Sequence, residues 1–231
     1  YLKKAAEQGH SEAQLLYGDH LYTGDGITRD FKEAARFFGL AATQGNPQAC
    51  FNFATDLIRG EGVKADEVDG YRYMRKAADM GHVEAMNRVA RMLFSGYGCG
   101  VPDMKKAAEY FKKAADAGSP EAMISYGKMA ADGVGFEGKQ IQEADKYLKM
   151  AADQHKKLEA YLLYSTFLEE QKKIEESNKY IKLAEATLDS ETIYRYAISL
   201  KEDNKKDQAE KYLKMAADKG NDKALNDYAA L

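Results

Sequence analysis

The sequence of 231 residues predicts an all-α fold, a right-handed α-solenoid superhelix of antiparallel helix-turn-helix repeats. The first observation behind this prediction is a segment with two adjacent alanines, the second of which is followed three residues later by glycine. The segment recurs with little change over residues 73–81, 109–118 and 212–220. Each copy indicates the end of a helix, because small alanines let a neighbouring helix approach and glycine readily adopts left-handed backbone.

The second observation is the spacing of these copies. When the first alanine of each copy is aligned, successive copies lie 36, 36, 37, 37, 33 and 32 residues apart. A period of this length is typical of one helix-turn-helix unit per repeat, stacked into a solenoid. The aligned alanines are Ala5, Ala41, Ala77, Ala114, Ala151, Ala184 and Ala216.

The third observation is a Gly-x-Gly turn after the first helix of four repeats, at residues 24–26, 60–62, 96–98 and 133–135. Such turns superficially resemble phosphate-binding loops. Here they follow helices rather than strands, and they repeat, so they indicate turns between paired helices.

Caps and turns predict the helices in chain order. Ser11 and Asp30 are expected N-caps, because a short polar side chain can accept hydrogen bonds from first-turn amides. Pro47 and Pro120 are expected in the first turn of their helices. After a helix end at residues 1–9, the predicted helices cover residues 11–22, 31–44, 47–59, 67–80, 83–95, 103–117, 120–132, 140–154, 158–171, 174–187, 190–201 and 205–219, and a half-unit begins at residue 221.

The residues after each Ala-Ala-x-x-Gly segment resemble a known family. An alanine is followed four residues on by an aromatic or aliphatic residue and then a small one, as in Ala13-Tyr17-Gly18 and Ala85-Val89-Ala90. With the Gly-x-Gly turns, this pattern resembles the Sel1-like repeat, a relative of the tetratricopeptide repeat, over essentially the whole chain.

The resemblance implies one repeat domain over residues 1–231 with about six repeats. It departs after about residue 154, where His155 replaces the terminal glycine and the Gly-x-Gly turns stop. Residues 1–154 are therefore expected to be Sel1-like, and residues 155–231 to form shorter tetratricopeptide-like units. The chain opens within a repeat, without methionine, and closes within another, so we expect a fragment of a longer protein.

Composition narrows the class of function. A net charge of −3 gives no electrostatic case for nucleic acid, and no stretch approaches 18 apolar residues, so no membrane insertion is expected. Cys50 and Cys99 fall at unrelated repeat positions and no glycosylation sequon is present. Both facts favour a reducing compartment. A cytoplasmic location is expected, with association to the endoplasmic reticulum left open.

The first helix of each repeat is expected to line the concave face, if tetratricopeptide geometry holds. Helical periodicity then directs to a groove the residues two, six and nine after the alanine of each first helix, such as Ala13 or Ala85, which we call the repeat alanine. Mixed apolar and polar lining suits a peptide or a partner helix. The candidate partner-binding residues are Asp19, Tyr22, Phe51, Thr55, Asn87, Arg88, Arg91, Phe94, Ile124, Lys128, Leu162, Thr166, Tyr194 and Ile198.

Two alternatives stay open for these candidates. Phe51, Phe94 and Tyr194 are equally compatible with packing between neighbouring repeats. The Asn87-Arg88-Arg91 cluster, joined by Lys128, resembles the way related repeat proteins hold a peptide's C-terminal carboxylate. The alternative for that cluster is a solvated helix face, balanced by Glu84 and Glu121.

The sequence contains no motif that indicates a catalytic site. His10 and His82 occupy equivalent turns and so belong to the repeat pattern, and neither His-x-x-x-His nor Cys-x-x-Cys occurs. No cofactor, metal or catalytic residue is expected, and Cys99 has no histidine near it in sequence to activate it.

A non-enzymatic scaffold that binds other proteins is therefore expected. The resemblance implies adaptors, including those of ubiquitin-ligase complexes in endoplasmic-reticulum-associated degradation, and of signalling complexes. The alternatives are a secreted Sel1-like hydrolase of β-lactamase type, whose cysteine pairs this chain lacks, and a structural protein that self-associates end to end.

Overall fold

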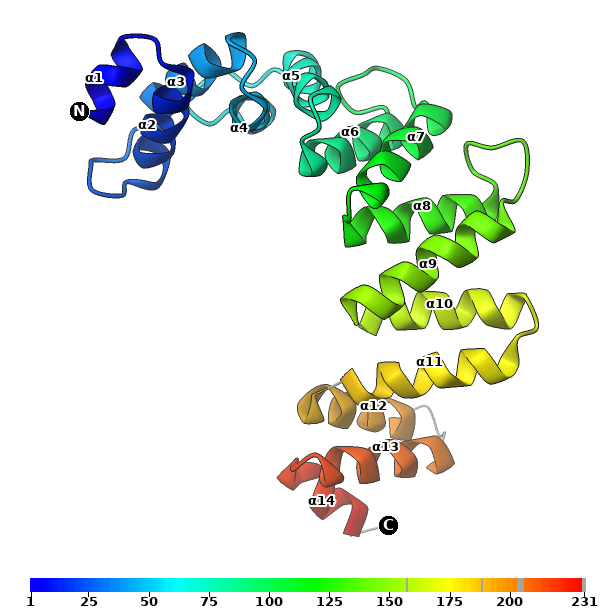
Figure 1. Ribbon diagram of the computed structural model, residues 1–231. Coiled ribbons are helices and arrows are strands. Elements are labelled where there is room, and N and C mark those ends of the chain that lie inside the picture. Colours follow the sequence, from blue (N-terminus) through cyan, green and yellow to red (C-terminus); the bar gives the residue numbers. More distant parts are fainter. Residues whose placement is uncertain (157, 188, 203–205, 230–231) are drawn as a thin grey trace. The chain divides into compact units, whose positions relative to one another are not determined.

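The computed structural model describes residues 1–156, 158–187, 189–202 and 206–229. Within these ranges every regular element is a helix, and neighbouring helices such as α2 and α3, α4 and α5, or α12 and α13 pack as antiparallel pairs (Figure 1). The predicted all-α repeat fold is therefore confirmed. The helices are α1 (Leu2–Glu7), α2 (Ser11–Thr23), α3 (Phe31–Thr43), α4 (Pro47–Arg59), α5 (Glu67–Asp79), α6 (Val83–Ser95), α7 (Met104–Asp116), α8 (Pro120–Asp132), α9 (Ile141–His155), α10 (Leu158–Glu170), α11 (Ile174–Thr187), α12 (Ser190–Glu202), α13 (Lys206–Asp218) and α14 (Asp222–Ala229).

Side-chain caps begin most helices of the first four repeats. Asp30 accepts a hydrogen bond from the Glu33 amide at 3.0 Å, and Asn46 accepts one from the Ala49 amide at 3.0 Å. Ser11, an expected N-cap, is instead the first residue of α2, and His10 occupies the cap position without a side-chain bond. His82, at the equivalent position of α6, does cap through Nδ1 to the Ala85 amide. An imidazole can therefore replace a short polar side chain at this turn.

The Gly-x-Gly turns end the first helix of each of these repeats. Their first glycines, at the C-caps of α2, α4, α6 and α8, have φ of 78°, 70°, 82° and 77°. This left-handed backbone is unfavourable for residues with a Cβ, so the turns depend on glycine. The prediction that these turns separate paired helices is confirmed.

The helices divide into two compact units, Tyr1–Ala151 and Ala152–Leu231. The boundary lies close to residue 154, where the sequence pattern changes. The single domain over residues 1–231 stays a prediction.

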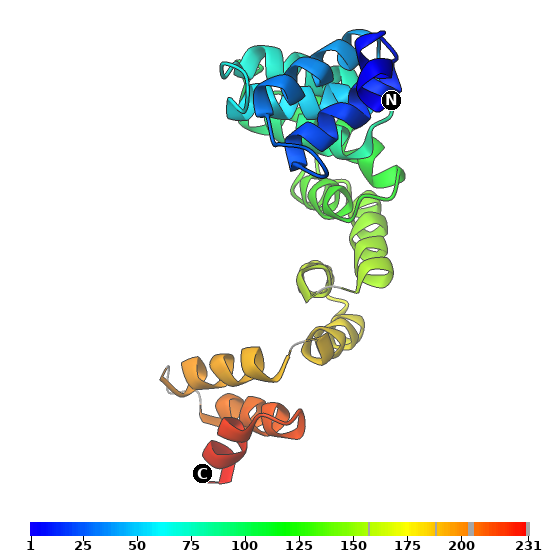
Figure 2. The ribbon, with the colours of Figure 1, turned by 90° about the vertical axis from the view of Figure 1, so that its left-hand side faces the viewer.

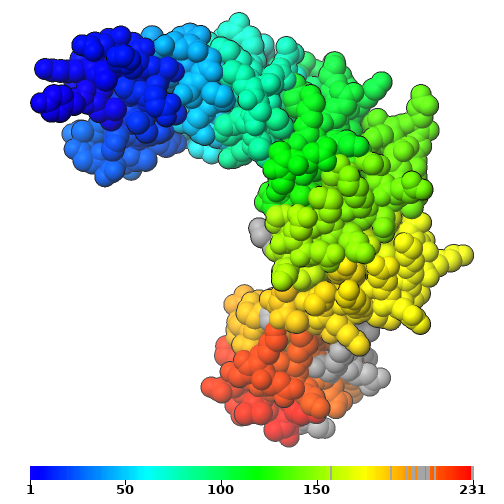
Figure 3. Space-filling model, in the orientation of Figure 1, coloured from blue at the N-terminus to red at the C-terminus, as the bar shows by residue number. Residues whose placement is uncertain are grey.

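Small residues form the core of the first unit. The first alanines of the repeat segments, Ala41, Ala77 and Ala114, are fully buried, as are Ala49 and Ala85 on the facing helices. Adjacent helices therefore approach closely, and the repeats of this unit pack without a break in the space-filling view (Figure 3). In Figure 1, α2, α4 and α6 lie along the inner side of the curve of this unit, and α3, α5 and α7 along its outer side.

The second unit packs around larger side chains. Tyr164, Tyr180 and Leu168 are almost fully buried between α10 and α11, and Ile193 and Leu213 between α12 and α13. Figure 2 shows α12 beside α13, in agreement with their close packing.

Tyrosine–aspartate hydrogen bonds connect the second helices of successive repeats. The Tyr110 hydroxyl donates to Asp79 Oδ1 at 2.5 Å, and that of Tyr147 donates to Asp116. Burial and the adjacent carboxylate raise the pKa of both tyrosines. The phenols therefore stay protonated and donate at any physiological pH. No described helix is both long and apolar enough to cross a membrane.

Candidate partner-binding face

Three cavities follow one another along the first helices of the repeats in the first unit. The first cavity, of about 290 Å³, lies between α2 and α4 and reaches Arg88 of α6. The second, of about 850 Å³, lies between α4 and α6 and reaches the start of α8. The third, of about 400 Å³, lies between α6 and α8.

Equivalent repeat positions build each cavity. One wall is the residue nine after the repeat alanine of one first helix. The opposite wall comes from the residues three and six after the repeat alanine of the next first helix. The back of the cavity is closed by the second helix between these two, through the residue three before its aligned alanine (Ala41, Ala77 or Ala114). These four positions hold Tyr22, Asn52, Thr55 and Phe38 in the first cavity, Ile58, Arg88, Arg91 and Met74 in the second, and Phe94, Ser125, Lys128 and Phe111 in the third.

The three cavities differ at the buried position seven after the repeat alanine. Met92 lines the second cavity and Met129 the third, with 7% and 5% of their surface exposed. The first cavity has Asp56 there, 2% exposed. A carboxyl group thus stands at the repeat position that a thioether occupies in the next two cavities.

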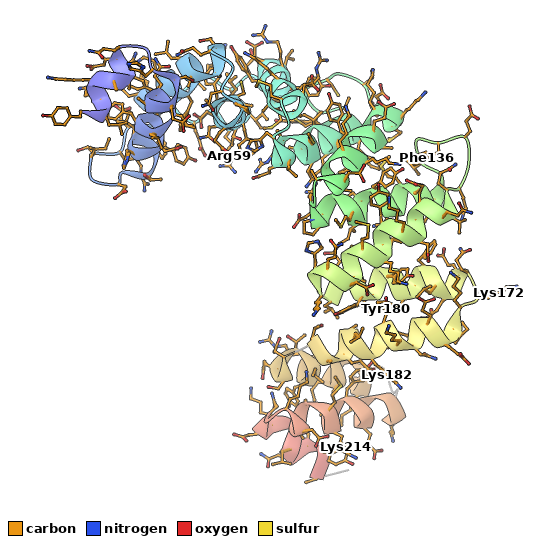
Figure 4. The ribbon with its side chains drawn as sticks, viewed as in Figure 1. Arg59, Phe136, Lys172, Tyr180, Lys182 and Lys214 are labelled. Atoms are coloured by element: carbon orange, nitrogen blue, oxygen red, sulfur yellow. The ribbon has the colours of Figure 1, made fainter. Side chains whose placement is uncertain are left out.

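Asp56 has an unusual environment for a carboxyl group. Its Oδ2 atom is buried and has no hydrogen-bond partner among the described residues. Burial, reinforced by the nearby Glu61 carboxylate and opposed by Arg59, raises the pKa of Asp56 to about 7. Figure 4 labels Arg59, which projects from the last turn of α4.

The other polar groups around the first cavity are paired. The Tyr22 hydroxyl donates to Glu61 Oε2 at 2.7 Å, and Asn52 Nδ2 donates to Asp19 Oδ1 at 3.1 Å. The pKa of Asp19 is raised, chiefly by burial.

Both arginines of the first cavity are also engaged. Arg59 lies 3.7 Å from Glu61, and Arg88 forms an ion pair with Glu84 at 2.9 Å. The Arg88 guanidinium also lies over the Phe51 ring, 5.1 Å from its centroid. Neither cation is therefore free to neutralise a further group without giving up a partner.

The second cavity contains an unpaired acceptor and a free cation. Asn87 Oδ1 is buried and has no hydrogen-bond partner among the described residues. Arg91 is exposed, forms no ion pair within the described ranges, and lines both the second and the third cavity. The third cavity adds exposed Phe94 and Lys128. Glu84 and Glu121 also line the second cavity and Asp132 the third, so the excess of positive charge lies at the third cavity, beside apolar surface.

The structure places nine of the fourteen candidates around these cavities. They are Asp19, Tyr22, Phe51 and Thr55 in the first, Asn87, Arg88 and Arg91 in the second, and Phe94 and Lys128 in the third. Ile124, on α8, is half-buried and lines none of the three. Their role in binding stays a prediction.

The remaining candidates lie in the second unit. Leu162 lines a separate cavity of about 370 Å³ there, together with Ile181 and Tyr212. Thr166 is exposed and its hydroxyl donates to the Leu162 carbonyl, while Ile198 is half-buried. Of these candidates in the second unit, only Leu162 lines the cavity described there.

The three aromatic candidates differ in their burial and in their contacts. Phe51 packs between repeats, since it is 9% exposed and its ring stacks on His82 at a centroid distance of 4.6 Å. Phe94 is 45% exposed and faces the third cavity. Tyr194 is half-buried and its hydroxyl donates to Asp227 Oδ2 at 2.9 Å.

Sequence reasoning missed Asp56, Asn52, Met92 and Met129, which all line the cavities. The signal was available, because aligning the repeats puts Asp56 in the column of the two methionines.

The described residues include no group of three or more histidine, cysteine, aspartate or glutamate side chains placed to hold a metal ion. Cys50 is buried and Cys99 is half-buried, and both are free thiols. Phe136 (Figure 4), between α8 and α9, packs edge-on against Tyr126 and lies outside the three cavities.

Comparison with known proteins supports the repeat assignment. A family model described as Sel1 repeat matches residues 1–10, 11–46, 47–82, 83–119, 120–156 and 193–221. The last match lies within the stretch expected to be tetratricopeptide-like. No curated protein sequence matches the chain.

Solved structures show the same fold. The protective antigen c5321 of uropathogenic Escherichia coli, described as displaying an SLR fold, has a TM-score of 0.76 at 23% identity. The match covers 100% of this chain and 50% of the antigen, so the chain spans half of its length. A Sel1 repeat protein from Oxalobacter formigenes has a TM-score of 0.67 at 23% identity, covering 95% of this chain and 77% of that protein. PilF of Pseudomonas aeruginosa has a TM-score of 0.54 at 13% identity, with coverages of 98% and 99%.

Proteins with these repeats generally mediate protein–protein interactions, and the fold is typically a non-enzymatic scaffold. Because the matched repeats cover most of the sequence, the chain belongs to the Sel1 repeat family.

Proposed function

We propose that the first unit binds an extended segment of a partner protein across α2, α4, α6 and α8, with partner side chains entering the three cavities. The observation that carries this proposal is the equivalence of the cavities, which are built from the same repeat positions. Repeated cavities at regular intervals suit alternating contacts with an extended chain, in which apolar anchors give affinity and polar groups set register.

The third cavity, where Arg91 and Lys128 outnumber Asp132, favours an acidic, partly apolar part of the partner. Phe94 offers an exposed aromatic surface beside the free cations Arg91 and Lys128. The buried Asn87 Oδ1 atom can accept a hydrogen bond from a partner amide, which would remove the cost of its unpaired state. The partner's carboxylate, from a side chain or its C-terminus, would lie between Arg91 and Lys128.

The test is selection of random twelve-residue peptides displayed on phage against the full chain, followed by affinity measurements on the enriched peptides. Phe94→Ala and Arg91→Ala are each expected to weaken binding at least tenfold, as anchor truncations commonly do. Arg72→Ala is the matched control, because Arg72 is an exposed arginine on α5 with a single ion pair, to Asp69.

Failure to enrich any peptide would contradict the proposal. So would enriched peptides whose affinity is unchanged by both cavity variants, or is lowered equally by Arg72→Ala. A role in ubiquitin-ligase or signalling complexes stays a prediction of the family resemblance, and a cytoplasmic location stays a prediction from the cysteines and the lack of a glycosylation sequon.

A further inference from the structure

We propose that the first cavity binds a basic side chain of the partner, a lysine ammonium or arginine guanidinium that donates hydrogen bonds to the Asp56 carboxylate. This inference rests on the proposed function and names the chemistry that one of the three cavities would recognise.

The first step is that packing does not require a carboxyl group at this position. Met92 and Met129 occupy the same position in the next two repeats and are also buried. A buried polar atom without a partner destabilises a fold by about 1–3 kcal/mol. Asp56 is therefore a poor choice for stability. Its side chain lines the cavity, and its buried Oδ2 atom has no hydrogen-bond partner among the described residues.

The second step is the balance of charge around the cavity. Three carboxyl groups, those of Asp19, Asp56 and Glu61, face two arginines. Arg59 is paired with Glu61, and Arg88 is paired with Glu84 outside the cavity wall. The uncompensated charge is therefore negative when Asp56 is ionised, and a cationic donor complements it.

The third step is the shape of the walls. The rings of Tyr22, Phe38 and Phe51 line the cavity, which has a volume of about 290 Å³. Such walls suit the apolar stem of lysine or arginine, which buries its methylenes while the charged end finds an acceptor. An aliphatic residue would fit the walls but leave Asp56 unpaired.

Binding should then depend on pH. The titratable or charged groups around Asp56 are Asp19 and Tyr22 from α2, Arg59 at the end of α4, Glu61 in the turn that follows it, and Arg88 from α6. The pKa of Asp56 is raised to about 7, so the free protein holds this carboxyl half-protonated at neutral pH. A cation binds the ionised form, so affinity should increase as pH rises through 7.

The experiment uses the full chain and two small probes, N-acetyl-lysine methylamide and N-acetyl-norleucine methylamide. The second probe has the same stem without the ammonium group. Titrations followed by amide resonances of α4 are made at pH 6 and pH 8. The lysine probe is expected to bind about tenfold more tightly at pH 8, following the ionised fraction of Asp56, and the norleucine probe to bind weakly and equally at both.

Two variants separate charge from folding. Asp56→Asn keeps the shape and removes the ionisation, and Asp56→Met installs the residue of the next two repeats. Both should lose the preference for the lysine probe and its pH dependence. Equal binding of the two probes by the wild-type protein, or a retained lysine preference in Asp56→Asn, would overturn the inference.

The peptide selection distinguishes this inference from the proposed function. Enriched peptides that carry a basic residue on the wild-type protein, and lose it on Asp56→Met, support both. Enriched peptides with the same basic content on both proteins contradict only the inference. A saturable lysine-specific signal without any enriched peptide supports the site and contradicts the extended partner segment.

Discussion

Replacing Asp56 with methionine is expected to stabilise the protein and to change how its stability depends on pH. The pKa of this buried carboxyl is raised from 3.8 to about 7. In the unfolded chain the group ionises near its ordinary pKa, so between pH 4 and pH 7 the unfolded state loses a proton that the folded state keeps. The free energy of unfolding of the wild-type protein therefore falls through this window because of Asp56.

The magnitude follows from the size of the shift. A shift of roughly three units, at about 1.4 kcal/mol per unit, corresponds to about 4 kcal/mol. The stability advantage of Asp56→Met should thus grow by up to about 4 kcal/mol from pH 4 to pH 8. Burial of the methionine side chain adds a further gain that does not depend on pH.

The assay is urea unfolding followed by helical circular dichroism at pH 4, 5, 6, 7 and 8. Asp56→Asn reports the loss of ionisation without the apolar gain, and should show the same slope with pH relative to wild type. Asp132→Asn, at an exposed position of α8, is the control and should follow the wild-type curve. A constant difference between Asp56→Met and wild type at all five pH values would refute the reasoning.

Two further predictions concern the turns and the tyrosine hydrogen bonds. Gly62→Ala should destabilise the protein by about 3 kcal/mol, because the new Cβ would lie 2.0 Å from the Phe31 carbonyl oxygen. Gly26→Ala, at φ +71° with no atom within 4 Å, should cost about 1 kcal/mol, and equal urea midpoints for the two variants would contradict this contrast. Tyr110→Phe removes the 2.5 Å hydrogen bond to Asp79 and should cost about 1–2 kcal/mol, so an unchanged thermal midpoint would show that this bond contributes nothing.

The repeat architecture could be predicted because its determinants are local. Asp30 caps α3 as expected, Pro47 starts α4, and Gly60 ends it in left-handed backbone. Each of these acts within a few residues of its own helix terminus, and none depends on how the repeats pack. The predicted helix over residues 31–44 accordingly differs from α3 by one residue.

It was harder to predict which side chains of the first helices point towards the cavities. A helical period gives the angle between residues but not the rotation of the whole helix, which is set by close packing against its neighbours. Gly18 shows this, because a Cβ there would lie 2.7 Å from the Phe38 ring. In the first cavity, Asn52 and Asp56, three and seven residues after Ala49, lie beside the predicted Phe51 and Thr55.

The internal repeats also provide a comparison that a single non-repeating domain lacks. Asp56, Met92 and Met129 occupy the same position, so differences between their cavities arise from side chains rather than from the fold. The first cavity carries the uncompensated carboxyl group, whereas the two cations Arg91 and Lys128 outnumber Asp132 in the third. Opposite charges at the two ends of one face favour a single direction for a bound segment, with its basic residue at α4 and its acidic residue at α8.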